Sequence, residues 1–135
     1  MKIGIVVSDF NGKITSVMER AAGKAAERLG AQIAKNFHVP GAFEIPFAAK
    51  LLFEDKEIDA VVALGAVIQG ETDHDVVIVN AIAPKLLELS LKNNKPFGFG
   101  IIGPRVSLKE AEERAEEYAE RAVKSALEMA KLTRK

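Results

Sequence analysis

The sequence contains no cysteine and no tryptophan, and it has only two histidines. A chain without cysteine forms no disulfide and offers no thiolate as a nucleophile or metal ligand. The two histidines, His38 and His74, lie far apart in the sequence, whereas zinc sites usually draw on closely spaced ligands. We therefore expect no metal site.

The sequence also has no net charge and no long hydrophobic run. Lys and Arg together number 19, as do Asp and Glu, so the basic surplus typical of nucleic-acid-binding proteins is missing. A membrane-spanning helix needs about 20 mostly apolar residues, and no run in this chain approaches that length. Met1 and Lys2 lead straight into a strand-like segment, without the pattern of a signal peptide. These absences argue against nucleic-acid and membrane partners and favour a cytoplasmic location.

What the sequence does contain is a regular alternation of strand and helix patterns. Its 135 residues, 48% of them hydrophobic, fit a single domain over residues 1–135 with a substantial core. Short β-branched runs predict strands at residues 2–7, 31–37, 59–68 and 97–102. Apolar residues at helical spacing predict helices at residues 14–29, 43–53, 74–92 and 107–132. We expect a turn at residues 38–41, and a capping box of Ser107 and Glu110 at the start of the last helix.

Four strand–helix repeats predict an α/β protein with one four-stranded parallel sheet. Right-handed crossovers place helices on both faces of such a sheet, which gives a three-layer α/β/α domain. Strand order 2-1-3-4, the flavodoxin-like arrangement, suits a chain this short, and its switch point lies between the first and third strands. The loops at residues 9–13 and 69–75 should then flank one crevice, with the segment at residues 38–44 beside them.

Small residues line one face of the last predicted helix. This face predicts very close packing against a neighbour, either within the chain or in a second copy of it. The two edges of a four-stranded sheet must also be shielded, and association is the common remedy, so we expect a homo-oligomer. The small-residue face consists of Ala111, Ala115, Ala119, Ala122, Val123, Ala126 and Ala130.

The segment at residues 65–75 is the strongest indication of chemistry. It leaves a buried strand through glycines and enters a helix at Thr72, where Asp75 follows at the spacing of a second capping box. A helix start of this kind can hold an anion, and His74 in its first turn can move a proton. An isolated histidine in such a turn is usually a solvated polar residue. We favour a functional role because this one coincides with the switch point.

Carboxylates near the same helix start oppose the binding of a phosphate. Glu71, Asp73 and Asp75 would repel it, so a cation must contribute. The candidates are Arg105 and Arg114, which follow the fourth strand on the side where the crevice opens. Taken alone, each arginine is more simply explained as an exposed surface charge.

A second pattern lies between two prolines at residues 40–46. The prolines restrict the backbone, Gly41 and Ala42 allow a ligand to approach it, and Glu44 can accept hydrogen bonds from hydroxyl groups. The simpler interpretation is a turn with a capping carboxylate. Phe10, in a polar loop, suits either a stacking surface for a planar ring or a hydrophobic plug. Phe99 is more typical of a core residue.

Together these segments resemble the lumazine synthases, the enzymes of the penultimate step of riboflavin biosynthesis, in the form of their archaeal branch. The resemblance implies a transferase that condenses two small molecules, 5-amino-6-(D-ribitylamino)uracil and 3,4-dihydroxy-2-butanone 4-phosphate. The product would be 6,7-dimethyl-8-ribityllumazine, with phosphate and water released and no cofactor used. It also implies a pentamer, with a 60-subunit shell as a larger alternative. The blocks that carry the resemblance are Asp9-Phe10-Asn11, residues 39–46, residues 65–74, residues 96–100 and Glu113-Arg114-Ala115.

The resemblance assigns roles to individual residues. Phe10 would stack on the pyrimidine with help from Asn11, and Glu44 would bind ribityl hydroxyls. The backbone around Ala42, Val67 and Ile68 would bind the polar edge of the pyrimidine. Main-chain amides of Glu71 and Thr72 would hold the phosphate with Arg114, and His74 would carry protons. Phe99 would come from a neighbouring subunit, and Phe43 and Gln69 complete the predicted substrate-binding set.

The chain departs from the lumazine synthases in two features, and two alternative functions remain. Many lumazine synthases have a lysine-containing segment where this chain has residues 116–121, and Arg121 is the one candidate to replace that lysine. The N-terminal extension that many of them use to pair with a neighbour's sheet is also missing here. The alternatives are an archaeal riboflavin synthase of the same fold and a non-catalytic, shell-forming structural protein. A receiver-type signalling domain lacks support, because Asp9 has no acidic neighbours and no aspartate ends the third strand.

Overall fold

The computed structural model describes residues 1–133 as a three-layer α/β/α domain. Its parallel sheet contains β1 (Lys2–Ser8), β2 (Gln32–Val39), β3 (Ala60–Ala66) and β4 (Phe97–Ile102) in the order β2-β1-β3-β4. The helices are α1 (Gly12–Arg28), α2 (Ile45–Phe53), α3 (His74–Asn93) and α4 (Leu108–Ala130), with a short 3-10 helix η1 (Ala42–Glu44) before α2. The predicted fold class and strand order are confirmed.

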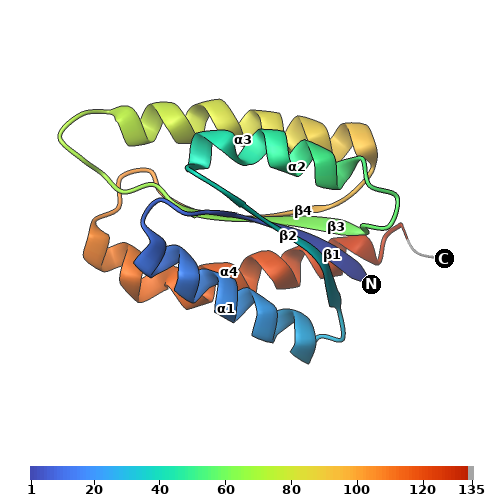
Figure 1. The fold of residues 1–135 in the computed structure, drawn as a ribbon. Coiled ribbons are helices and arrows are strands. Elements are labelled where there is room, and N and C mark those ends of the chain that lie inside the picture. Colours follow the sequence, from blue (N-terminus) through green and yellow to red (C-terminus); the bar gives the residue numbers. More distant parts are fainter. Residues whose placement is uncertain (134–135) are drawn as a thin grey trace.

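The helices form two layers, one on each face of the sheet. Helices α1 and α4 lie together on one face, and α2 and α3 cover the other (Figure 1). The central strands β1 and β3 are almost wholly buried, as expected for strands covered on both faces. The loops that follow the strands at their carboxyl ends gather at the end of the sheet away from the N-terminus (Figure 1). This end contains the candidate site.

The small-residue face of α4 packs within the chain. Every one of its members is at most 4% exposed, against α1 and the sheet, which settles the choice between intramolecular and intermolecular packing. Gly98 of β4 shows how close this packing is. A Cβ added there would lie 2.2 Å from the backbone oxygen of Ala122, nearer than real Cβ atoms approach a carbonyl. A side chain at this position would therefore push the helix away from the sheet.

Several predicted boundaries were wrong by a few residues. β2 continues through His38 and Val39, which were expected in a turn, because β1 still offers partners there: Val7 is paired with His38 and Ser8 with Val39. β3 is shorter than predicted and ends at Ala66. The helix expected from residue 43 starts as η1, and Pro46 lies in the first turn of α2, where its missing N–H costs no hydrogen bond.

Of the two predicted capping boxes, one is confirmed and one was wrong. Ser107 Oγ accepts from the backbone N of Glu110 at 3.1 Å, and Glu110 Oε1 accepts from the backbone N of Ser107 at 3.0 Å. At α3, by contrast, the N-cap residue is Asp73, and its side chain makes no capping bond. Asp75 is buried and turned away, because its Oδ2 accepts the backbone N–H of Arg105 at 2.8 Å.

The described part of the chain contains no helix with both the length and the hydrophobicity needed to cross a membrane.

Candidate active site

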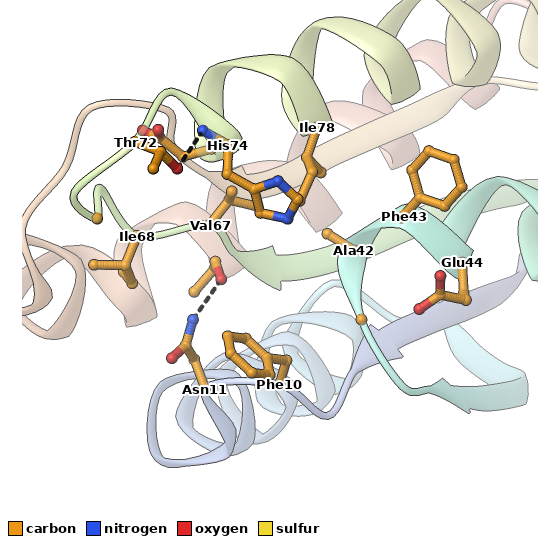
Figure 2. Close-up of a pocket in the computed structure, with 14 residues that line it drawn as sticks. Phe10, Asn11, Ala42, Phe43, Glu44, Val67, Ile68, Thr72, His74 and Ile78 are labelled. Atoms are coloured by element: carbon orange, nitrogen blue, oxygen red, sulfur yellow. Dashed lines mark hydrogen bonds between the residues drawn. The ribbon is translucent and has the colours of Figure 1, made fainter.

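A cavity of about 640 Å³ lies beyond the carboxyl ends of β1 and β3, where the switch point was expected. Its volume is within the range of small-molecule sites, and its walls come from three separate segments of the chain. Figure 2 shows these walls facing one another. The structure brings together the following predicted site residues: Phe10, Asn11, Ala42, Phe43, Glu44, Val67, Ile68, Thr72 and His74.

The first wall is the loop between β1 and α1. Asn11 has a left-handed backbone (φ 61°), which asparagine tolerates better than most residues. Its side-chain Nδ2 donates to the backbone oxygen of Ala66 at 2.8 Å and so ties the start of α1 to the end of β3. The backbone N of Phe10 donates to the oxygen of Pro40 at 3.0 Å. Phe10 is 70% exposed and borders the cavity (Figure 2), so it is not a plug in the core, and its ring is open to the cavity.

The second wall is η1, which follows β2. Glu44 folds back over the preceding turn, since a Cβ added at Gly41 would lie 3.2 Å from Glu44 Oε1. Glycine at position 41 therefore leaves room for this carboxylate beside the cavity. Phe43 is 63% exposed at the same wall, where its ring adds apolar surface. The wall combines an acceptor for hydroxyl groups with an aromatic side chain.

The third wall is the segment between β3 and α3. It is anchored on the connection between β4 and α4, because Val67 N donates to Ile102 O and Gln69 N donates to Val106 O, both at 2.8 Å. Gly103 makes this contact possible: its φ is 120°, and an added Cβ would lie 2.3 Å from Val67 O. A substitution there would displace the segment that forms this wall.

His74 begins α3 and borders the cavity. Its ring projects toward the space between Val67 and Ala42 (Figure 2), and its backbone N donates to Thr72 Oγ1 at 3.3 Å. Among residues 1–133, no lysine or arginine lines the cavity, and of its two carboxylates Asp75 already accepts an N–H from the protein. The side chain of the N-cap residue Asp73 makes no capping bond, so the first-turn N–H groups of α3 that follow His74 are left to an anion.

Four predicted site residues do not line this cavity. Gln69 and Glu71 are exposed on the third wall segment, and Arg114 is exposed on α4. Phe99 is 39% exposed on β4, where its ring packs against Phe97 at a centroid distance of 6.0 Å. Phe99 lines a separate hollow of about 330 Å³ together with Tyr118 and Arg121 of α4.

Ile78 and one polar cluster were missed from the sequence, and Gly41, Ala66, Gly70 and Asp75 also line the cavity outside the predicted set. Ile78 lines the cavity one helical turn after His74, a position that the four-residue spacing could have indicated. His38 was placed in a turn, yet it contacts both Asp9 and Glu19. The signal for this cluster was the pairing of β2 with β1 beyond Phe37, the residue at which the predicted strand ended too early.

Comparison with known proteins agrees with this geometry. The family model described as 6,7-dimethyl-8-ribityllumazine synthase matches residues 1–134. A 6,7-dimethyl-8-ribityllumazine synthase of Metallosphaera sedula is 51% identical over 134 residues, 99% of this chain and 89% of that protein. The protein of the same name from Aeropyrum pernix is 50% identical, over 97% of this chain and 90% of its own length. The chain therefore belongs to the 6,7-dimethyl-8-ribityllumazine synthase family.

Proposed function

We propose that this chain is the transferase that condenses 5-amino-6-(D-ribitylamino)uracil with 3,4-dihydroxy-2-butanone 4-phosphate. The product is 6,7-dimethyl-8-ribityllumazine, and phosphate and water leave. The observation that carries the proposal is one cavity in which Phe10, Glu44 and His74 meet from three segments, in a chain that matches this family over residues 1–134. The cavity has room for both substrates, and its residue types suit a ring, hydroxyl groups and a proton transfer.

The first two walls bind the pyrimidine substrate in this proposal. The exposed ring of Phe10 stacks on the pyrimidine, because a flat aromatic surface stabilises a planar ring at little cost in side-chain entropy. Glu44 accepts hydrogen bonds from ribityl hydroxyls, and Asn11 holds the Phe10 loop to the end of β3. The polar edge of the pyrimidine binds backbone groups near Ala42 and Val67. Phe43 and Ile68 close this part of the cavity with apolar surface.

The third wall binds the phosphorylated substrate. The segment that leads into α3 provides the backbone N–H groups of Glu71 and Thr72 next to the start of the helix, and Gln69 lies on the same segment. Because no cation of residues 1–133 lines the cavity, Arg114 completes the phosphate site from α4 of the same subunit or of a neighbouring one. His74 carries protons during imine formation, phosphate elimination and ring closure. Holding two reactive molecules together supplies most of the remaining rate.

A homo-oligomer is part of the proposed function. The layer of α2 and α3 exposes large apolar side chains, and a groove of about 460 Å³ runs between these two helices. Both β2 and β4 are free sheet edges within the chain. Phe99 lies on β4, at the edge of the sheet opposite β2, and in this proposal it enters the cavity of a neighbouring subunit from there. A pentamer meets these requirements, and a 60-subunit shell would extend them.

One experiment separates the proposed reaction from its alternatives. The purified chain is mixed with both substrates while lumazine absorbance and phosphate release are followed, and the two signals should rise together. Riboflavin formed from lumazine alone would instead identify a riboflavin synthase. A stable assembly with neither activity would identify a structural shell protein.

A further inference from the structure

A cluster of polar side chains outside the cavity joins three segments of the chain. We define the His38 cluster as His38 and Asn36 of β2, Glu19 of α1 and Asp9 of the loop after β1. His38 Nδ1 lies 2.6 Å from Asp9 Oδ1, and His38 Nε2 lies 2.8 Å from Glu19 Oε2. Asn36 Nδ2 donates to the same Glu19 oxygen at 2.7 Å. One imidazole therefore bridges two carboxylates from different elements.

This bridge requires a protonated ring. A neutral imidazole has one N–H donor, and its other nitrogen carries a lone pair that would face a carboxylate oxygen. An imidazolium donates from both nitrogens, and hydrogen bonds between charged partners are shorter and stronger than neutral ones. With both contacts at hydrogen-bond distance, the geometry is that of the imidazolium.

The His38 cluster is connected to two walls of the cavity through the backbone. Asp9 directly precedes Phe10, and the backbone N of Asp9 donates to Val39 O at 2.8 Å. Phe10 N donates to Pro40 O at 3.0 Å, so the strand-like pairing of these two segments continues past the end of β1. His38 itself lies just before the turn that leads to η1. The side-chain bridge and the backbone bonds therefore hold the same two segments together.

We propose that His38 is a positioning residue for the pyrimidine side of the cavity, and that it fixes the loop carrying Phe10 by bridging Asp9 and Glu19. This role rests on the proposed function, because it assigns the Phe10 surface to the pyrimidine substrate. His38 does not line the cavity and does not touch the reacting atoms. It acts through Asp9 on the position of the Phe10 loop.

The charges around His38 make this positioning dependent on pH. The hydrogen bond to Asp9 raises the pKa of His38, and the bond to Glu19 raises it further, while partial burial opposes both effects. Across residues 1–133 these two carboxylates, one from the loop and one from α1, are the charged groups that act on the ring. Because the pKa is raised, both bonds are present at pH values below it. One bond is lost as the pH rises through the raised value, which loosens the Phe10 loop.

The first test is steady-state kinetics of three variants in the full-length protein. His38→Ala should raise the KM for the pyrimidine substrate about tenfold, with kcat and the KM for the phosphorylated substrate nearly unchanged. In the unmodified protein the same KM should rise at alkaline pH. His38→Arg keeps a charge that does not titrate and several N–H donors, so it should restore a low KM and flatten the pH profile. Lys35→Ala is the matched control, since it removes an ion pair to Asp55 from the same strand without touching the His38 cluster.

An unchanged pyrimidine KM in His38→Ala would overturn the proposal, and so would an equal rise in Lys35→Ala, which would indicate general loosening of β2. The second test does not depend on turnover. Hydrogen exchange at the backbone amides of Asp9 and Phe10 should quicken in His38→Ala but not in Lys35→Ala, because these amides bond to Val39 and Pro40. Unchanged exchange would contradict the bridge even in an active enzyme. Faster exchange in a chain that shows no lumazine formation would support the bridge and refute the proposed reaction.

Discussion

The two helix layers of this molecule differ in how much apolar surface they bury within the chain and in whether their helix starts are capped. The layer of α1 and α4 buries its apolar face against the sheet through alanines, and a capping box closes the start of α4. The layer of α2 and α3 leaves Phe47, Leu87 and Leu91 exposed, each by more than half, and the N-cap residue of α3 makes no side-chain cap. The first layer buries its small-residue face within the chain, although Leu108 and Met129 of α4 are exposed too. The second still offers a groove and free N–H groups to a ligand or to another subunit.

From this difference we expect the chemistry of the proposed site to depend on the layer of α2 and α3. His74 and Thr72 come from the start of α3, and η1 leads directly into α2. A helix end that satisfies its own N–H groups, like that of α4, has little to offer an anion. We therefore expect catalytic and assembly effects for changes in α2 and α3. Apart from Arg114 and the loop before α1, we expect stability effects for changes in α1 and α4.

The largest expected effect is the loss of the proton carrier. His74→Ala should lower kcat by about 10²- to 10⁴-fold, the usual contribution of a positioned acid–base group, and leave residual activity from substrate positioning. Lumazine formation at saturating substrates measures it. Asn80→Ala, at an exposed position of the same helix, is the control and should leave kcat unchanged. An equal kcat in His74→Ala would remove the catalytic role from the α2 and α3 layer.

The next effect concerns assembly through the same layer. Phe47 is 73% exposed and borders the groove between α2 and α3. Phe47→Glu should weaken subunit association by about 2–4 kcal/mol if Phe47 is a central contact, and so shift the sedimenting species to lower mass. Met129→Glu changes an apolar side chain of α4 that is 51% exposed, and it should leave the mass unchanged. A loss of mass in Met129→Glu alone would reverse the comparison between the layers.

The third effect tests the packing of the layer formed by α1 and α4. Gly98→Ala places a Cβ against the backbone of Ala122, and overpacking of this kind costs about 1–3 kcal/mol of unfolding free energy. Gly23→Ala in α1 is the matched control, because its Cβ would meet no atom closer than 4.0 Å. That control should stabilise the protein by about 0.5–1 kcal/mol, since alanine favours a helix interior over glycine. Urea unfolding measures both changes, and a neutral Gly98→Ala would mean that α4 can shift at little cost.

The sequence predicted the helices of both layers to within two residues at each end. Hydrophobic period and a complete capping box are local signals, and the helices followed from them, whereas the strand order followed from the flavodoxin-like arrangement. The capping box expected at the start of α3 was wrong because Asp75 bonds to Arg105, thirty residues away, and no local pattern encodes that contact. His38 was missed for a related reason. Its role depends on how far β2 pairs along β1, which is a property of the sheet and not of the turn-like residues around it.

The smallest effect compares the two helix starts directly. Ser107→Ala removes the side-chain cap of α4 and should cost about 1 kcal/mol of unfolding free energy, whereas Thr72→Ala at α3 should change it by less than about 0.5 kcal/mol.

The difference should depend on pH. Hydrogen bonds from the backbone and side chain of Ser107 lower the pKa of Glu110, so the Glu110 half of the box is complete above the ordinary glutamate pKa. It is lost as the pH falls through the lowered value. Since the alanine variant keeps the backbone donor and loses only the side chain, urea unfolding at neutral and acid pH should show the penalty of Ser107→Ala shrinking in acid. A penalty that stays constant would mean that the Ser107 side chain and the Glu110 carboxylate contribute to the cap independently.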